Sequence, residues 1–224
     1  MTTANRPISI AALSGIVFVV LVVVHAILLG SPPTLEDPSG EIVRYLADKD
    51  AEFKVGAYLQ GLAVVAFLWF LGSVWQVVRV SEGGPGRLSV VAVAATAVLV
   101  ALVGVHIAIL TGLALRADEG LDAAVVSYLY VISFVALALS AFAAAALTGA
   151  IGVVILRHGA LPRWLGVFSL VSAVLWLLAG VGATTESEAW GGIGFVAFLV
   201  WLVWTAVTSV IVARRPATVE VAAR

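Results

Sequence analysis

Residues 88–115 read LSVVAVAATAVLVALVGVHIAILTGLAL, a stretch without a charged side chain. The hydrocarbon core of a bilayer is about 30 Å thick, and about 20 apolar residues of α-helix are needed to cross it. Outward from this stretch, five further apolar runs cover residues 8–29, 53–80, 123–156, 164–182 and 191–213. The few charged residues lie between these runs or near their ends. The sequence therefore predicts six transmembrane segments.

The composition agrees with a membrane domain. Of the 224 residues, 62% are hydrophobic and only 11% are charged, whereas roughly 25% of the residues of an average soluble domain are charged. In hydrocarbon every backbone N–H and C=O group must be paired, which restricts spanning structures to helices and closed barrels. Because the runs are long and show no period-two alternation, we expect an all-α polytopic bundle of six transmembrane helices. It forms a single membrane domain over residues 1–224.

The first run is predicted to be a retained helix rather than a secretory signal peptide. Its apolar stretch is longer than the roughly 7–15 apolar residues of a signal peptide. It is followed by Ser31-Pro32-Pro33, with no A-x-A-like cleavage site.

Several functional classes are disfavoured by composition and by missing motifs. A net charge of −1 gives no basic surface for a nucleic acid partner. The chain has no cysteine, which excludes disulfides, thiolate metal sites, iron–sulfur clusters and cysteine nucleophiles. No phosphate-binding glycine loop, His-Glu-x-x-His zinc motif or Gly-x-Ser-x-Gly motif occurs. We therefore favour a protein that is not an enzyme.

The basic residues between the runs predict the orientation. The side of the N-terminus carries eight arginines: Arg6, Arg79, Arg87, Arg157, Arg163, Arg214, Arg215 and Arg224. The opposite side carries only Arg44, Lys49, Lys54 and Arg116, together with most of the acidic residues. Short loops rich in Lys and Arg stay in the cytoplasm. We expect an integral protein of a bacterial plasma membrane with both termini cytoplasmic, including a short tail at residues 214–224.

The longest connection, residues 30–52, is predicted to contain a short amphipathic helix on the outer surface of the membrane. Asp37 followed by Pro38 is typical of an N-cap and a first helical position. Ile42, Tyr45 and Leu46 then recur at helical spacing. Two interpretations stay open, a lid over an outward-facing pocket and a strap that bridges the first two membrane helices.

The order of these parts resembles a bacterial family of six-helix integral membrane proteins known only as a domain of unknown function. The matching segments are EIVRYL at residues 41–46, FKVG at 53–56 and LPRWLG at 161–166. The resemblance covers most of the chain and implies the same six-helix fold. It carries over no catalytic residue, because the family has no established chemistry.

Within the runs, polar side chains gather at one depth. If the first and third runs rise outward and the second and fourth descend, several polar residues share the outer half of the membrane, and the predicted ligand-binding residues come from this group. They are His25, Gln60, His106, Tyr130 and Ser133. No Asp, Glu, Lys or Arg falls clearly inside a run, which disfavours an ion-coupled pump or transporter built on a buried carboxylate.

His25 and His106 admit three interpretations. They form hydrogen bonds between helices, contact a ligand, or act as ligands of a haem or a transition metal. Their predicted depths differ by roughly 7 Å, which argues against a neat axial pair. On the third run, Ala97, Ala101, Gly104 and Ala108 form a small-residue stripe expected to pack against a neighbouring helix. His106 points away from that stripe, and no cofactor is predicted.

Tryptophans suggest membrane anchors and a second pocket. Trp164 and Trp190 lie at ends of runs, where aromatic rings favour the membrane interface. Trp201 and Trp204 lie deeper and share one face of the last run. That face either packs in the core or lines an apolar cavity for an isoprenoid, quinone or lipid tail.

The leading function is binding or passage of a small or lipid-like molecule through an outward-facing pocket within the lipid bilayer. One alternative is a haem- or metal-binding redox protein that uses His25 and His106. The other is a structural partner of another membrane protein. The sequence predicts neither the identity of the ligand nor the oligomeric state.

Overall fold

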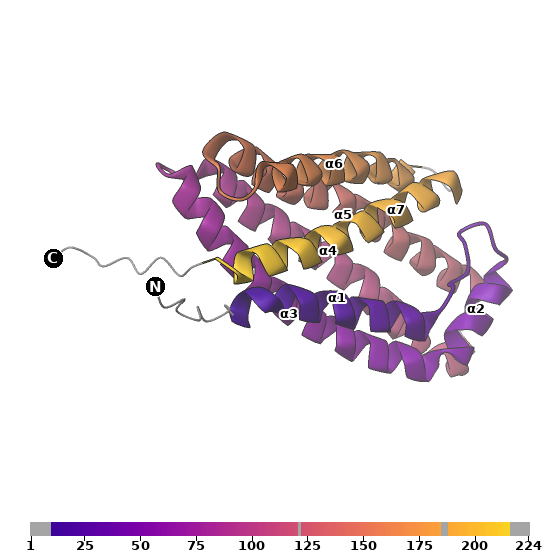
Figure 1. Ribbon diagram of the computed structural model, residues 1–224. Helices are drawn as coiled ribbons and strands as arrows, with labels where there is room; N and C mark the ends of the chain where they lie inside the picture. Colours follow the sequence, from indigo (N-terminus) through magenta and orange to yellow (C-terminus); the bar gives the residue numbers. More distant parts are fainter. Residues whose placement is uncertain (1–9, 121, 185–187, 216–224) are drawn as a thin grey trace.

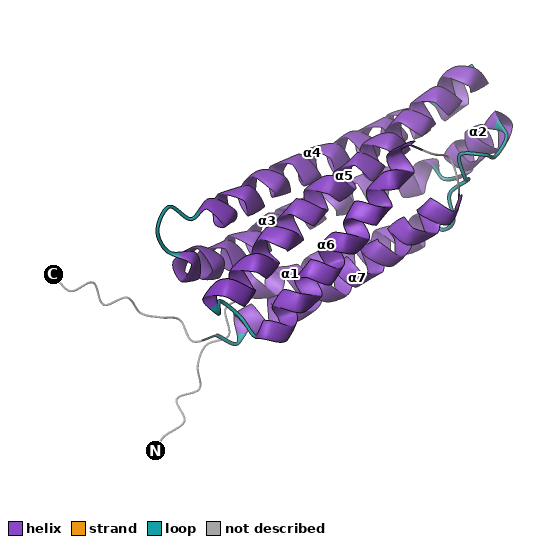
Figure 2. Cartoon of the chain, turned by 90° about the horizontal axis from the view of Figure 1, so that it is seen from above, coloured by secondary structure: helices purple, strands orange, loops and turns teal. Residues whose placement is uncertain are grey.

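The chain forms an elongated bundle of α-helices in a computed structural model, which describes residues 10–120, 122–184 and 188–215. Seven α-helices occur in these ranges, with two short 3₁₀ helices and no strand (Figure 2). The helices are α1 (Ile10–Leu29), α2 (Ser39–Asp48), α3 (Asp50–Glu82), α4 (Arg87–Ala114), α5 (Ala123–His158), α6 (Arg163–Ala179) and α7 (Glu188–Ala213). The 3₁₀ helices are η1 (Ala117–Glu119) and η2 (Gly180–Thr184).

Six of these helices are long and apolar enough to cross a membrane, as judged by length and composition. They correspond to the six predicted runs, and their described ends agree with the predicted ends to within three residues. The all-helical fold and the six apolar helices are thus confirmed, and they fit a multi-pass membrane protein. The predicted start of the first run at residue 8 lies outside the described residues.

Polar side chains satisfy backbone groups where two of the long helices begin. Asp122 is the N-cap of α5, and its carboxylate accepts hydrogen bonds from the backbone N–H groups of Ala124 and Val125. The carboxylate of Glu82 accepts from the N–H groups of Leu88 and Ser89, 2.7 and 2.9 Å away, in the first turn of α4. Such contacts satisfy N–H groups that a helix leaves unpaired at its start.

Small residues allow α5 and α6 to approach closely. A Cβ added at Gly152 of α5 would lie 3.0 Å from the carbonyl oxygen of Gly166 of α6. The small residues predicted to pack on α4 behave differently, because Ala97, Ala101, Gly104 and Ala108 are all exposed. The prediction that this stripe packs against a neighbour is therefore wrong within one chain. Leu99 and Leu110, on another side of α4, are buried in the bundle instead.

Aromatic rings from three helices fill the centre of the bundle. Trp201 of α7 meets Phe18 of α1 and Phe67 of α3 with ring centroids 5.3 Å apart in both pairs. Trp204 is fully buried, and its indole N–H donates to the hydroxyl of Ser169 at 2.8 Å. These contacts favour the packing interpretation of Trp201 and Trp204 over a pocket wall.

The connection between α1 and α3 contains the helix α2, which lies across one end of the bundle (Figure 1). Two residues of α2 itself, Ile42 and Leu46, are buried against the bundle. The predicted N-cap at Asp37 is wrong, since Pro38 occupies that position. The Asp37 carboxylate accepts the backbone N–H of Thr34 at 2.6 Å instead and so closes the turn before the helix. Because proline carries no polar side chain, α2 begins without a side-chain cap.

Candidate functional site

A small cavity of about 30 Å³ lies between α1, α3 and α4. Its lining residues include Leu29, the last residue of α1, and Phe53, in the first turn of α3, so it is near the end of the bundle that α2 covers. Its lining residues are His25 and Leu29 of α1, Phe53 and Ala57 of α3, and His106, Ile107, Leu110 and Thr111 of α4. The volume is sufficient for one or two water-sized groups. The two histidines, which are 81 residues apart in the chain (106 − 25), thus share one cavity.

His25 is held against the second turn of α3. Its Nδ1 lies 3.2 Å from the carbonyl oxygen of Gly56. A Cβ on residue 56 would come within 2.8 Å of the same nitrogen, so the ring reaches this position only because residue 56 is glycine.

His106 is held in a similar way by a different helix. Its Nδ1 lies 3.0 Å from the carbonyl oxygen of Ser133 in α5. The imidazole also meets the ring of Phe134 edge-on, with ring centroids 5.0 Å apart. These two contacts fix both the position and the tilt of the ring.

The two carbonyl contacts determine the protonation of both rings. A carbonyl oxygen only accepts hydrogen bonds, so Nδ1 carries the proton in each histidine. In the neutral imidazole Nε2 is then an acceptor with a free lone pair. Neither Nε2 has a hydrogen-bond partner among the residues that the structure describes. The cavity is therefore bordered by two rings that each retain one unpaired acceptor nitrogen.

Of the other predicted site residues, Tyr130 and Ser133 are buried behind this cavity rather than in its wall. The Tyr130 hydroxyl donates to the carbonyl oxygen of Pro33 at 2.6 Å, and the Ser133 hydroxyl donates to the carbonyl oxygen of Tyr130 at 2.7 Å. Ser133 reaches the site through its backbone, because its carbonyl oxygen accepts from His106. Gln60 is half-buried on α3 and is not part of the cavity wall.

The helix α2 forms a cap above the cavity. Ile42 and Leu46 pack in one apolar cluster with Phe53 and Leu110, two residues that also line the cavity. At the edge of this cluster, the Tyr45 hydroxyl donates to the carbonyl oxygen of Leu29 at 3.0 Å. Burial, with a smaller contribution from the charge of Glu52, raises the pKa of Tyr45, so this hydroxyl keeps its proton at neutral pH.

Sequence reasoning missed three contributors to the site. Gly56 supplies an acceptor and the space for His25, Thr111 adds a hydroxyl to the cavity wall, and Pro33 accepts the Tyr130 hydrogen bond. The FKVG segment at residues 53–56 contained the only available signal, a glycine in the first turns of a helix that opens opposite the end of α1.

Comparisons with models of protein families, with curated proteins and with solved structures found no match to this chain. This outcome agrees with the resemblance to an uncharacterised family, and nothing more follows from it.

Proposed function

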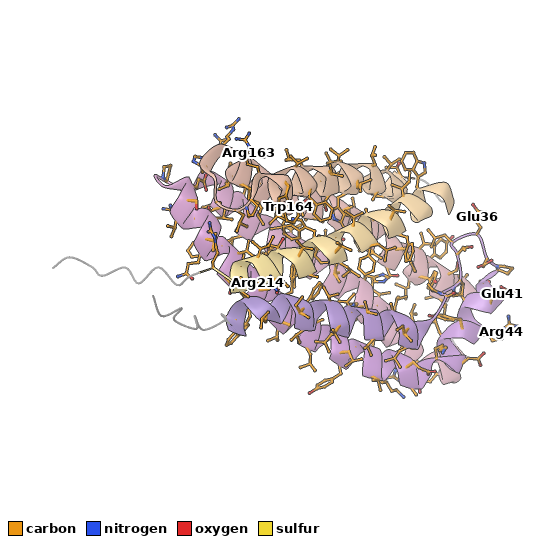
Figure 3. The ribbon with its side chains drawn as sticks, viewed as in Figure 1. Glu36, Glu41, Arg44, Arg163, Trp164 and Arg214 are labelled. Carbon is orange, nitrogen blue, oxygen red and sulfur yellow. The ribbon has the colours of Figure 1, made fainter. Side chains whose placement is uncertain are left out.

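We propose that this chain is a multi-pass protein of a bacterial plasma membrane with both termini in the cytoplasm. The six apolar helices support membrane insertion. Arg163 and Arg214 lie at the end of the bundle where α1 begins, whereas Glu36, Glu41 and Arg44 lie at the end that α2 covers (Figure 3). Under the positive-inside rule the arginine-rich end faces the cytoplasm. The helix α2 and the histidine cavity then lie toward the outer face.

In this orientation the protein binds a small ligand in the cavity between His25 and His106, without catalysing a reaction. The observation that carries the proposal is that both histidines line one cavity and each retains an unpaired Nε2. A volume of about 30 Å³ favours a ligand of one or two heavy atoms over the lipid-like molecule among the predicted ligands.

A metal-binding protein is the second candidate. Histidines that bind metals usually donate their other ring N–H to a carbonyl or carboxylate group, which fixes the tautomer. His25 and His106 show this arrangement through the carbonyl oxygens of Gly56 and Ser133. A haem does not fit the cavity, because its macrocycle is many times larger than about 30 Å³. A single ion does fit.

Mass spectrometry under native conditions tests the proposal. We expect the full chain, purified from its native membranes in mild detergent, to carry a reproducible extra mass. His25→Asn and His106→Asn keep a side-chain N–H close to the position of Nδ1 and remove Nε2. Each should lose the extra mass, whereas the control His158→Asn, at the exposed end of α5, should keep it.

The result separates a ligand site from interhelical hydrogen bonding. If the histidines act only by donating to Gly56 and Ser133, the asparagine variants preserve that role. A bare-chain mass for the unmodified protein, or an extra mass that persists in both variants, would contradict the proposed function.

A further inference from the structure

The donor set of the cavity restricts the kind of ligand that it accepts. Two imidazole nitrogens are its strongest donors, with the Thr111 hydroxyl beside them. The rest of the wall is apolar, and no lining residue carries a carboxylate. Across the residues that the structure describes, no group of three or more His, Cys, Asp or Glu side chains comes together. The site thus offers two neutral nitrogen ligands and no compensating negative charge.

Most biological metal ions do not match this set. Zn²⁺ in proteins usually has three or four protein ligands in a tetrahedral arrangement. Ca²⁺ and Mg²⁺ require several oxygen ligands. A divalent ion would also lose its hydration on entering this apolar cavity, and no carboxylate is present to offset that cost.

From the two histidines in one cavity wall we infer that the cavity holds a single monovalent copper ion, Cu(I), with Nε2 of His25 and Nε2 of His106 as its ligands. Imidazole is a suitable ligand for copper, and a d¹⁰ monovalent ion is stable with only two nitrogen ligands. Its single charge lowers the cost of burial relative to a divalent ion. This inference rests on the proposed function, for which it names the ligand.

The surroundings of the two rings suit such an ion. Phe53, Ile107 and Leu110 line much of the remaining wall with apolar groups, which offer no further ligand to an ion. The Gly56 and Ser133 carbonyl oxygens hold the rings in the tautomer that coordination through Nε2 requires. No change in the oxidation state of the metal is part of the inference, because binding alone accounts for these features.

Silver is a suitable probe, since Ag(I) has the same charge and prefers two ligands but does not oxidise in air. We expect the full-length protein in detergent to bind one Ag(I) per chain when titrated under native mass spectrometry. His25→Asn and His106→Asn should each weaken binding by about tenfold or more. His158→Asn should bind as the unmodified protein does, and Zn²⁺ should show no equivalent site.

The outcomes separate the metal from the broader function. If Ag(I) fails to bind, or binds equally well to both asparagine variants, the copper site is overturned. Equal binding of Zn²⁺ also overturns it. If the extra mass of the natively purified protein still depends on both histidines in those cases, the proposed function stands with another ligand. If that dependence is also missing, the proposed function fails as well.

Discussion

Gly56 determines whether His25 reaches the cavity. A side chain at this position would collide with the imidazole, because an added Cβ lies 2.8 Å from Nδ1. We expect Gly56→Ala to displace the ring, break its bond to the residue 56 carbonyl and lower the free energy of unfolding by about 1–3 kcal/mol. Ligand retention should fall with it. Thermal unfolding in detergent and native mass measure the two effects.

Gly61 provides the matched control on the same helix. It is exposed, and an added Cβ would meet nothing within 4 Å. Gly61→Ala should therefore leave retention unchanged and should not lower stability, because alanine favours a helix over glycine. Equal effects of the two substitutions would show that close packing against His25 is unimportant.

At the scale of single residues, the sequence indicated which side chains belong to the site but not the backbone carbonyl groups to which they bond. His25 and His106 are conspicuous because imidazoles are rare in apolar runs. Their shared cavity depends on the relative rotation of α1, α3 and α4, which depth alone does not determine. Gln60 has a similar predicted depth, but it lies outside the cavity wall. The carbonyl groups of Gly56 and Ser133 have no sequence signature.

The helix α2 is joined to the bundle by apolar packing and by a few hydrogen bonds to backbone carbonyl groups. The connection that leads into α2 is held by one more such bond, in which the Tyr130 hydroxyl donates to the carbonyl oxygen of Pro33 at 2.6 Å. We expect Tyr130→Phe to weaken the cap by about 1 kcal/mol while preserving the packing of the ring against Phe134. Hydrogen exchange of backbone amides in residues 39–48 should become faster.

Tyr128 serves as the control, because it lies on the same helix and is 73% exposed. Tyr128→Phe should leave the exchange of α2 unchanged. If Tyr130→Phe also leaves it unchanged, the hydroxyl contact does not hold the cap, and the apolar contacts of Ile42 and Leu46 alone account for its position.

The long elements were predictable because hydrophobic runs of this length have few alternatives. The first residue of α2 was less predictable, because an Asp-Pro pair occurs both at the N-cap of a helix and in the turn before one. Asp37 instead accepts from Thr34, and the helix begins one residue later than predicted. The packing of α4 was also missed, since small residues allow close approach without specifying a partner.

On the scale of the whole molecule, the absence of cysteine allows the orientation to be tested directly. We expect Glu36→Cys to react with a membrane-impermeant maleimide on intact cells, because residue 36 lies at the end that α2 covers. His158→Cys, at the exposed C-terminal end of α5, should react only after the cells are opened. The reverse pattern would contradict the proposed orientation.

The overall architecture was the part most accessible from sequence. Apolar runs and charged connections depend only on composition along the chain, and both reappear as six helices with charged ends. The filled centre around Trp201 was not predictable, since an aromatic face is equally suited to line a cavity or to pack against other rings.

The central claim is that His25 and His106 present their Nε2 atoms to one common ligand. Nitrogen-15 NMR of the histidine rings tests it directly, because the chain contains only three histidines. We predict that both rings carry the proton on Nδ1, and that both Nε2 signals shift together when Ag(I) is added while His158 does not. A proton on Nε2 of either ring, or a shift of only one ring, would contradict the account.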